Sequence, residues 1–286
     1  MLVTPIPIIP FGEHYFKAAV ILRQSFFIGG ILFNTEAWYG LNENEMQEFE
    51  MIDNILLRKI FKSHSKVAKE ALYLELGVLP MRFIIMARRV NFLYYILKLD
   101  KKELLSKFYH SQKLNPSKND WTTRVKRDME ILSINLTDEQ IASVSKFKFK
   151  KMIKEKARQA AFEYLIEIKN SHSKMDNLQY SQLEMQKYLS NNFIYKNDAQ
   201  LLFKLRTRMA EFKGNFKNGN VDLSCDFCSE EDLQDHVLVC DAVASNIPEA
   251  SQVQYENIFS NNDKEVKRTL EAIKKAIKFR ENKSDD

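Results

Sequence analysis

Hydrophobic residues recur along this 286-residue chain at the 3.6-residue spacing of α-helices. The clearest example follows a predicted N-cap at Asn42, with Glu45 at the third helical position. Its apolar positions are Met46, Phe49, Ile52, Leu56 and Ile60. The chain has only seven glycines and six prolines, too few for the many tight turns of a strand-rich fold. The pattern therefore predicts an all-α protein.

Other amphipathic segments are separated by polar turns or helix-breaking residues. The predicted helices cover approximately residues 13–33, 69–77, 80–97, 121–131, 137–168, 178–189, 198–212 and 263–280. Three prolines predict an extended lead-in over residues 1–12, and residues 281–286 are expected to fray. The apolar stretch from Ala18 to Phe33 is too short to cross a bilayer and contains Arg23. It is predicted to be a buried helix, and no membrane contact is expected.

Charge is distributed unevenly, although the net charge is only +5. Residues 61–160 carry 22 basic and 10 acidic side chains, whereas residues 221–286 carry 8 and 15. Clustered lysines and arginines displace counterions from phosphates, so the basic 82–158 block predicts a surface for RNA or DNA. The candidate nucleic-acid-binding residues are Arg82, Arg88, Arg89, Lys146, Lys148, Lys150, Lys151, Lys154, Arg206 and Arg208.

These basic residues also have simpler interpretations. The lysine-rich segment 146–158, with its two interleaved phenylalanines, is also typical of a solvated helix face. The arginines at 82, 88 and 89 lie off the apolar stripe of their predicted helix and could reach either solvent or phosphate. The arginines at 206 and 208 precede aromatic residues, which more often face a protein core than stack on bases.

All three cysteines lie with one histidine inside sixteen residues, as Cys225, Cys228, His236 and Cys240. Two cysteines separated by two residues make a tight turn, and a histidine and a cysteine four apart share one helix face. A redox pair would leave His236 and Cys240 unexplained, and an odd number of cysteines without a recognisable signal peptide argues against a disulfide. The spacing predicts a structural Zn²⁺ site without a position for a catalytic water.

Acidic residues surround this predicted zinc knuckle. They are Asp222, Asp226, Glu230, Glu231, Asp232 and Asp235. Such a surface would repel phosphate. The knuckle is therefore expected to hold the C-terminal helices together or to meet a protein partner.

Four strings and the knuckle occur in an order that resembles a known family. The strings are ILFNTEAWYG at 31–40, IDNILLRKI at 52–60, ALYLELG at 71–77 and RRVNFLYYIL at 88–97. Over about residues 12–240 the chain resembles the region after the polymerase palm in metazoan non-LTR retrotransposon reverse transcriptases. Knuckles of this family often have glycine near the second cysteine, whereas Ser229 stands here.

The resemblance implies an elongated, all-α organisation in four parts. These are a thumb-like region at 1–100, a basic helical linker at 101–220, the knuckle at 221–242, and a linker with a terminal amphipathic helix at 243–286. In the family this region grips the RNA template and the primer duplex. The implied partner is RNA or DNA, in an intracellular setting that could be cytoplasm or nucleus.

The sequence lacks the carboxylates of a polymerase active site. The family's Tyr/Phe-x-Asp-Asp turn does not occur in these 286 residues, and the only adjacent aspartates are Asp285 and Asp286. We therefore expect a truncated reverse-transcriptase-derived protein that binds nucleic acid without sequence preference and does not polymerise DNA alone. The alternative is a helical protein-interaction scaffold with no nucleic-acid role.

Overall fold

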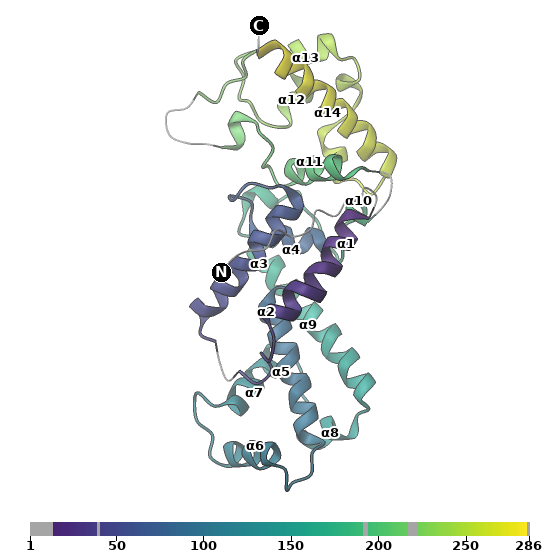
Figure 1. Ribbon diagram of the computed structural model, residues 1–286. Coiled ribbons are helices and arrows are strands. Elements are labelled where there is room, and N and C mark those ends of the chain that lie inside the picture. Colours follow the sequence, from purple (N-terminus) through teal and green to yellow (C-terminus); the bar gives the residue numbers. More distant parts are fainter. Residues whose placement is uncertain (1–13, 39–40, 191–193, 217–221, 285–286) are drawn as a thin grey trace.

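The computed structural model describes residues 14–38, 41–190, 194–216 and 222–284. These residues form an elongated all-α molecule, and no β-sheet occurs among them (Figure 1). Helices α11 to α14 lie at one end of the long axis, and α6, α7 and α8 lie at the other (Figure 1). The predicted fold class is confirmed. The proposed lead-in at residues 1–12 lies outside the described residues.

The helices follow one another with short connections. They are α1 (Tyr15–Leu22), a π-helical segment (Arg23–Ile28), α2 (Gly29–Ile31), α3 (Glu43–Phe61), α4 (Lys69–Leu76), α5 (Met81–Leu97), α6 (Leu104–Leu114), α7 (Trp121–Ile131), α8 (Asp138–Ser143), α9 (Lys146–Lys169), α10 (Lys187–Ser190), α11 (Lys196–Arg206), α12 (His236–Val239), α13 (Asp241–Asn246) and α14 (Asp263–Ser284). Short 3-10 turns cover Ser173–Met175, Lys213–Asn215, Ala250–Gln252 and Tyr255–Phe259.

Several helices begin where the sequence predicts. Before α3, the Asn42 side chain accepts a hydrogen bond from the Glu45 N–H, and the Glu45 carboxylate accepts one from the Asn42 N–H. Helix α5 starts directly after Pro80, and α7 spans Trp121–Ile131. Local capping and proline signals are sufficient here because they act within one turn of the chain.

The buried face of α3 differs from its predicted apolar stripe. Met46 and Ile60 are buried, but Ile52 is 44% exposed, and the carboxylates of Glu50 and Asp53 are buried instead. Asp53 receives two hydrogen bonds from Arg23, the shorter at 2.5 Å, and Glu50 pairs with Arg82 at 2.7 Å. The buried charges are tolerated because partners from other helices compensate them.

The single helix predicted over residues 137–168 is two helices. Val144 adopts an extended conformation, and Ser145 caps α9 by accepting a hydrogen bond from the Lys148 N–H. The Val144 carbonyl accepts a hydrogen bond from the Tyr94 hydroxyl of α5 at 3.1 Å. The run Ser143-Val144-Ser145 contains poor helix formers, and this tertiary contact satisfies the backbone group that the break leaves open.

The prediction of a helix over residues 178–189 is also wrong. Only Lys187–Ser190 is helical, and the preceding residues cross the end of α4, where Leu76 and Met185 form an isolated bridge. Gly77 ends α4 with φ +63°, and a Cβ there would lie 2.2 Å from the Glu184 carbonyl carbon. Glycine is required at this crossing, and the contact keeps residues 178–186 non-helical despite their helical pattern.

Two other helix ends differ from the predictions, and one helix was not predicted. Helix α11 ends at Arg206 instead of Phe212, and Arg208 has a left-handed backbone with φ +52°. Helix α14 continues to Ser284, beyond the predicted end at residue 280. Helix α6 was not predicted; it buries Tyr109, while Leu104, Leu105, Phe108 and Leu114 are exposed.

Helix α5 is the central element of the core and packs against α9 and α7. Its Tyr94 ring stacks on Phe149 of α9 at 5.0 Å, and its Phe92 meets Trp121 of α7 edge-on at 5.8 Å. Farther along the molecule, Phe203 of α11 stacks on Phe61 of α3 with ring centroids 3.7 Å apart. These contacts lie in the main hydrophobic core of the described residues. A second, smaller core cluster consists of Ile28, Leu32, Met46, Met81, Ile84 and Ile85.

Candidate metal centre and basic groove

The first two metal ligands lie on a tight turn. The Cys225 N–H donates to the Glu230 carbonyl at 2.6 Å, and the Ser229 N–H donates to the Cys225 carbonyl at 3.0 Å. Ser229 has φ +63°, a conformation that glycine adopts most readily. The turn is therefore made without glycine, as the sequence required, and serine carries the modest strain of the left-handed conformation.

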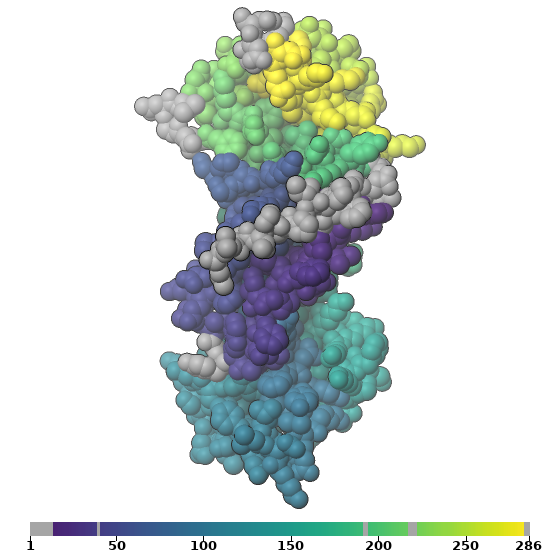
Figure 2. All heavy atoms as spheres, viewed as in Figure 1, coloured from purple at the N-terminus to yellow at the C-terminus, as the bar shows by residue number. Residues whose placement is uncertain are grey.

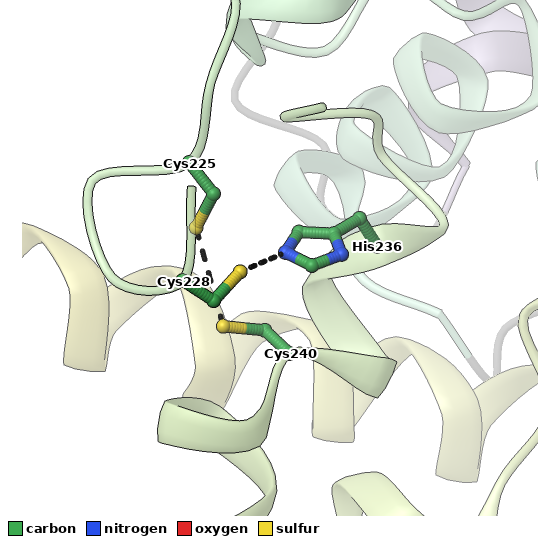
Figure 3. A group of neighbouring side chains, drawn as sticks. All are labelled: Cys225, Cys228, His236 and Cys240. Atoms are coloured by element: carbon green, nitrogen blue, oxygen red, sulfur yellow. Dashed lines mark hydrogen bonds between the residues drawn. The ribbon is translucent and has the colours of Figure 1, made fainter. Parts of the chain in front are cut away.

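The other two ligands come from the short helix that follows. His236 is the first residue of α12 and Cys240 directly follows its last residue, and both side chains face the turn (Figure 3). The ligand atoms of all four residues lie within 4.8 Å of one another. The Cys225 and Cys240 sulfurs are 4.0 Å apart, and the Cys228 sulfur is 3.0 Å from His236 Nε2. We call Cys225, Cys228, His236 and Cys240 the Cys/His cluster.

This geometry fits a tetrahedral metal ion. Sulfurs bound to one zinc at about 2.3 Å lie about 3.8 Å apart, close to the observed separation of Cys225 and Cys240. His236 directs Nε2 into the cluster, while its Nδ1 lies 3.5 Å from the Glu230 carboxylate. A carboxylate on the outer nitrogen is the usual support of a metal-binding histidine. None of the three cysteines is in a disulfide.

The thiols of the cluster influence one another's protonation. A hydrogen bond from the Glu230 backbone lowers the pKa of the Cys228 thiol, but lost solvation and the neighbouring Cys240 and Cys225 thiols outweigh it and raise the pKa to about 11. Metal binding would replace these protons, since the thiolate is the ligand. The predicted ligands are thus brought together in a form that could hold a metal ion.

Helix α14 is anchored beside the Cys/His cluster by Arg280. Its guanidinium donates to the Asp232 carboxylate at 2.6 Å, lies 3.8 Å from the Cys225 sulfur, and covers the Phe212 and Phe227 rings. Asp232 also accepts a hydrogen bond from the Lys213 N–H. Asp232 is therefore buried and paired, and does not belong to an exposed acidic surface.

Three of the arginines predicted to bind nucleic acid instead form ion pairs with carboxylates of the fold. The expectation that Arg89 reaches solvent is wrong, because it is fully buried and pairs with Asp128 at 2.5 Å. Arg206 is also buried and pairs with Glu75 at 3.2 Å. Arg82, largely buried, holds Glu50 and Glu43. The partner carboxylates lie 32 to 131 positions away in the sequence, so no local pattern identifies them.

The predicted lysines on α9 remain on the surface. Those at 146, 148, 150, 151 and 154 are exposed, and Arg208 is exposed in the C-terminal half. Phe147 is 78% exposed, whereas Phe149 is fully buried against Tyr94. The interleaved phenylalanines therefore have different roles: one packs the core and the other stands among lysines in solvent.

A groove of about 920 Å³ opens between α5, the start of α9 and the segment after α2. We call it the basic groove. Its lining residues are Gly29, Phe33, Asn34, Glu36, Arg88, Asn91, Phe92, Tyr94, Tyr95, Lys98, Lys146 and Lys150. In the space-filling view, the N-terminal residues in purple border the blue and teal residues of α5 to α9 (Figure 2). Three of the predicted nucleic-acid-binding residues, Arg88, Lys146 and Lys150, line this groove.

Contacts with α5 and α7 fix the segment after α2 that lines the basic groove. The Trp121 indole N–H donates to the Glu36 carbonyl at 2.8 Å, and the Arg88 guanidinium donates to the Leu32 carbonyl. Sequence reasoning missed Phe33, Tyr95 and Lys98 in this site. The repeat of aromatic and basic residues at helical spacing, from Arg88 to Lys98, was the available signal.

Comparisons with protein-family models, with curated protein sequences and with solved structures gave no match. Among the described residues, no helix combines the length and the apolar character needed to cross a bilayer.

Proposed function

We propose that the protein binds nucleic acid without sequence preference, and that the basic groove is the binding surface. The observation that carries this proposal is the convergence of four basic side chains, from Arg88, Lys98, Lys146 and Lys150, on one groove with a single carboxylate, Glu36. The groove also presents aromatic rings, which suit nucleic acids better than simple anions. Positive charge that is scattered in the sequence is thereby concentrated where a backbone of phosphates can lie.

The start of α9 adds to this attraction. Lys146 is its first residue, so the unpaired N–H groups and the positive end of the helix dipole lie at the groove. The lysines repel one another when no anion is present. Phosphate binding relieves that repulsion and releases counterions, which supplies affinity without reading bases.

The metal of the Cys/His cluster is proposed to be Zn²⁺ in a structural role. Three thiols and one imidazole are ligands that zinc accepts in closed tetrahedral sites. Arg280 and Asp232 connect the cluster to α14, so the metal would fix the C-terminal helices.

The family resemblance supports a more specific proposal. The protein is a thumb and linker region of reverse-transcriptase type that holds template or primer, without polymerase chemistry of its own. Support comes from the ordered strings between residues 31 and 97 and from the terminal Cys/His cluster. The absence of the Tyr/Phe-x-Asp-Asp turn from these 286 residues leads us to expect no primer extension by the isolated chain.

The test compares two charge reversals on the same helix. Lys146→Glu with Lys150→Glu changes two groove residues, whereas Lys148→Glu with Lys151→Glu makes the same change in net charge at exposed positions outside the groove lining. Fluorescence anisotropy with labelled oligonucleotides would measure affinity between about 50 and 200 mM salt. The first pair should weaken binding at least about tenfold, and the second much less.

The salt dependence provides a second readout. If four phosphates are contacted, the logarithm of the binding constant should fall with the logarithm of salt concentration at a slope of about −3. The groove variant should have a shallower slope. No binding at low salt, or equal losses in the two variants, would contradict the proposal.

An alternative function as a protein-interaction scaffold is supported by α6. Its Leu104, Phe108 and Leu114 are exposed at the end of the molecule, and exposed apolar residues of this size commonly meet partners. The acidic residues of the knuckle are a second candidate contact for a protein. Recovery of partner proteins after nuclease treatment, together with no oligonucleotide binding, would favour the scaffold.

A further inference from the structure

Tyr95 lines the basic groove. Its ring stacks on Phe92, with centroids 5.9 Å apart and planes 13° from parallel. Phe92 is in turn held edge-on by Trp121 at 5.8 Å. Tyr95 is nevertheless 53% exposed. The stack fixes the orientation of a ring that solvent still reaches, as a platform for a flat ligand requires.

Phe33, in the segment after α2, is a second exposed aromatic residue that lines the groove. It is 70% exposed, an uncommon state for phenylalanine, and the adjacent backbone is fixed by the Arg88 contact with the Leu32 carbonyl. Next to the groove, Phe147 is 78% exposed between Lys146 and Lys148. Exposed rings and basic groups therefore occur together in the groove and at the start of α9 beside it.

We infer that the basic groove takes single-stranded nucleic acid in preference to duplex, with bases stacked on Tyr95 and Phe33 and phosphates on the surrounding lysines. This inference rests on the proposed function and specifies its ligand. In a duplex the bases are already stacked on one another, and only the backbone and the base edges are accessible. Aromatic platforms beside basic groups add affinity only when unpaired bases can reach the rings.

The experiment uses the full chain and two probes of the same sequence. One is a labelled single strand of about 20 nucleotides, longer than the 4 to 16 nucleotides of typical single-strand sites. The other is that strand annealed to its complement. The single strand should bind at least about fivefold more tightly. Tyr95→Ala and Phe33→Ala should each weaken single-strand binding about 5- to 100-fold, the range of one lost base stack, with little effect on the duplex.

Two controls separate stacking from folding and from general exposure. Tyr95→Phe keeps the ring and should retain single-strand affinity. Tyr195→Ala removes a ring that is 73% exposed outside the groove, and should change nothing. Circular dichroism and thermal melting of each variant confirm that the fold is intact.

Outcomes that overturn the inference differ from those that overturn the proposed function. If the lysine variants weaken binding but the duplex binds as tightly as the single strand, the inference fails and the proposed function stands. Unchanged single-strand affinity in both Tyr95→Ala and Phe33→Ala also defeats it. If neither probe binds at low salt, the proposed function itself fails.

Discussion

Individual charged residues in this protein have two different uses, which sequence alone does not separate. Arg89 and Arg88 are neighbours on α5, yet one is fully buried against Asp128 and the other lines the basic groove. Consecutive helical residues point about 100° apart, so Arg88 lines the groove while Arg89 faces Asp128 of α7. A buried arginine requires an oppositely charged partner, and nothing in the sequence identifies Asp128 as the partner of Arg89.

The Arg89–Asp128 pair yields a stability prediction. Both side chains are fully buried, and two hydrogen bonds join them at 2.5 and 3.2 Å. Asp128→Ala would leave the guanidinium buried without its partner, so we expect the free energy of unfolding to fall by about 3–5 kcal/mol. Chemical denaturation of the metal-loaded protein measures the loss.

The adjacent Arg127→Ala is the matched control for that measurement. Arg127 is exposed on the same helix, and its replacement should change stability by less than about 0.5 kcal/mol. If Asp128→Ala costs no more than Arg127→Ala, Arg89 does not depend on this pair, and its assignment as a structural residue is wrong.

At the scale of elements, the crossing of α4 by the non-helical segment 178–186 depends on Gly77. Gly77→Ala would place a methyl group 2.2 Å from the Glu184 and Met185 backbone, at a residue with φ +63°. Strain and overlap together should lower the free energy of unfolding by about 3 kcal/mol or more.

Gly30→Ala is the control, because nothing lies within 4 Å of its Cβ position and it is helical. The control should be neutral or slightly stabilising. Equal effects of the two substitutions in thermal melting would refute this view of the crossing.

A comparison between the helix starts and this crossing shows which elements can be predicted from the sequence. The caps at Asn42 and Thr137 and the start of α5 after Pro80 depend on residues within one turn, and these predictions are confirmed. Residues 178–186 have a helical pattern, but the Gln186 N–H bonds to the Glu75 carbonyl, more than 100 positions earlier. Such tertiary contacts override local preference, and no local pattern contains them.

The two candidate sites also differ in how completely the sequence predicts them. The Cys/His cluster was predicted completely, because its four ligands are few, chemically distinctive and close in sequence. The basic groove was predicted only in part, since Phe33 lies more than 50 positions from Tyr95 and over 100 from Lys146. Its lysines were identifiable by charge, but their aromatic companions resemble core residues until exposure is known.

At the scale of the whole molecule, the Cys/His cluster and the basic groove lie in different halves of an elongated fold (Figure 1). The cluster is surrounded by the C-terminal helices, to which Arg280 connects it. The groove is built from α5, α9 and the segment after α2, which pack on α7 and α4. Loss of the metal should therefore loosen one end of the molecule before the other.

Metal removal tests this separation. Structural zinc contributes on the order of 10 kcal/mol in small zinc modules, so removal of the proposed Zn²⁺ by a chelator, or Cys228→Ser, should unfold the region around α12, α13 and α14. Hydrogen exchange should show lost protection there, while α5 and α9 remain protected and oligonucleotide affinity at the groove changes little. Metal analysis should give one equivalent for the unmodified chain and a reduced content for Cys228→Ser.

A contrary result would be equally informative about how the halves are connected. Helix α11 joins them, since Phe203 stacks on Phe61 of α3 and Arg206 binds both Glu75 of α4 and the Ile258 carbonyl. If chelation abolished protection in α5 and α9 together with α14, the molecule would unfold as one cooperative unit through these contacts. If Cys228→Ser kept full metal content and full protection of α14, the cluster would not hold the C-terminal helices, and Arg280 with its aromatic neighbours would have to do so alone.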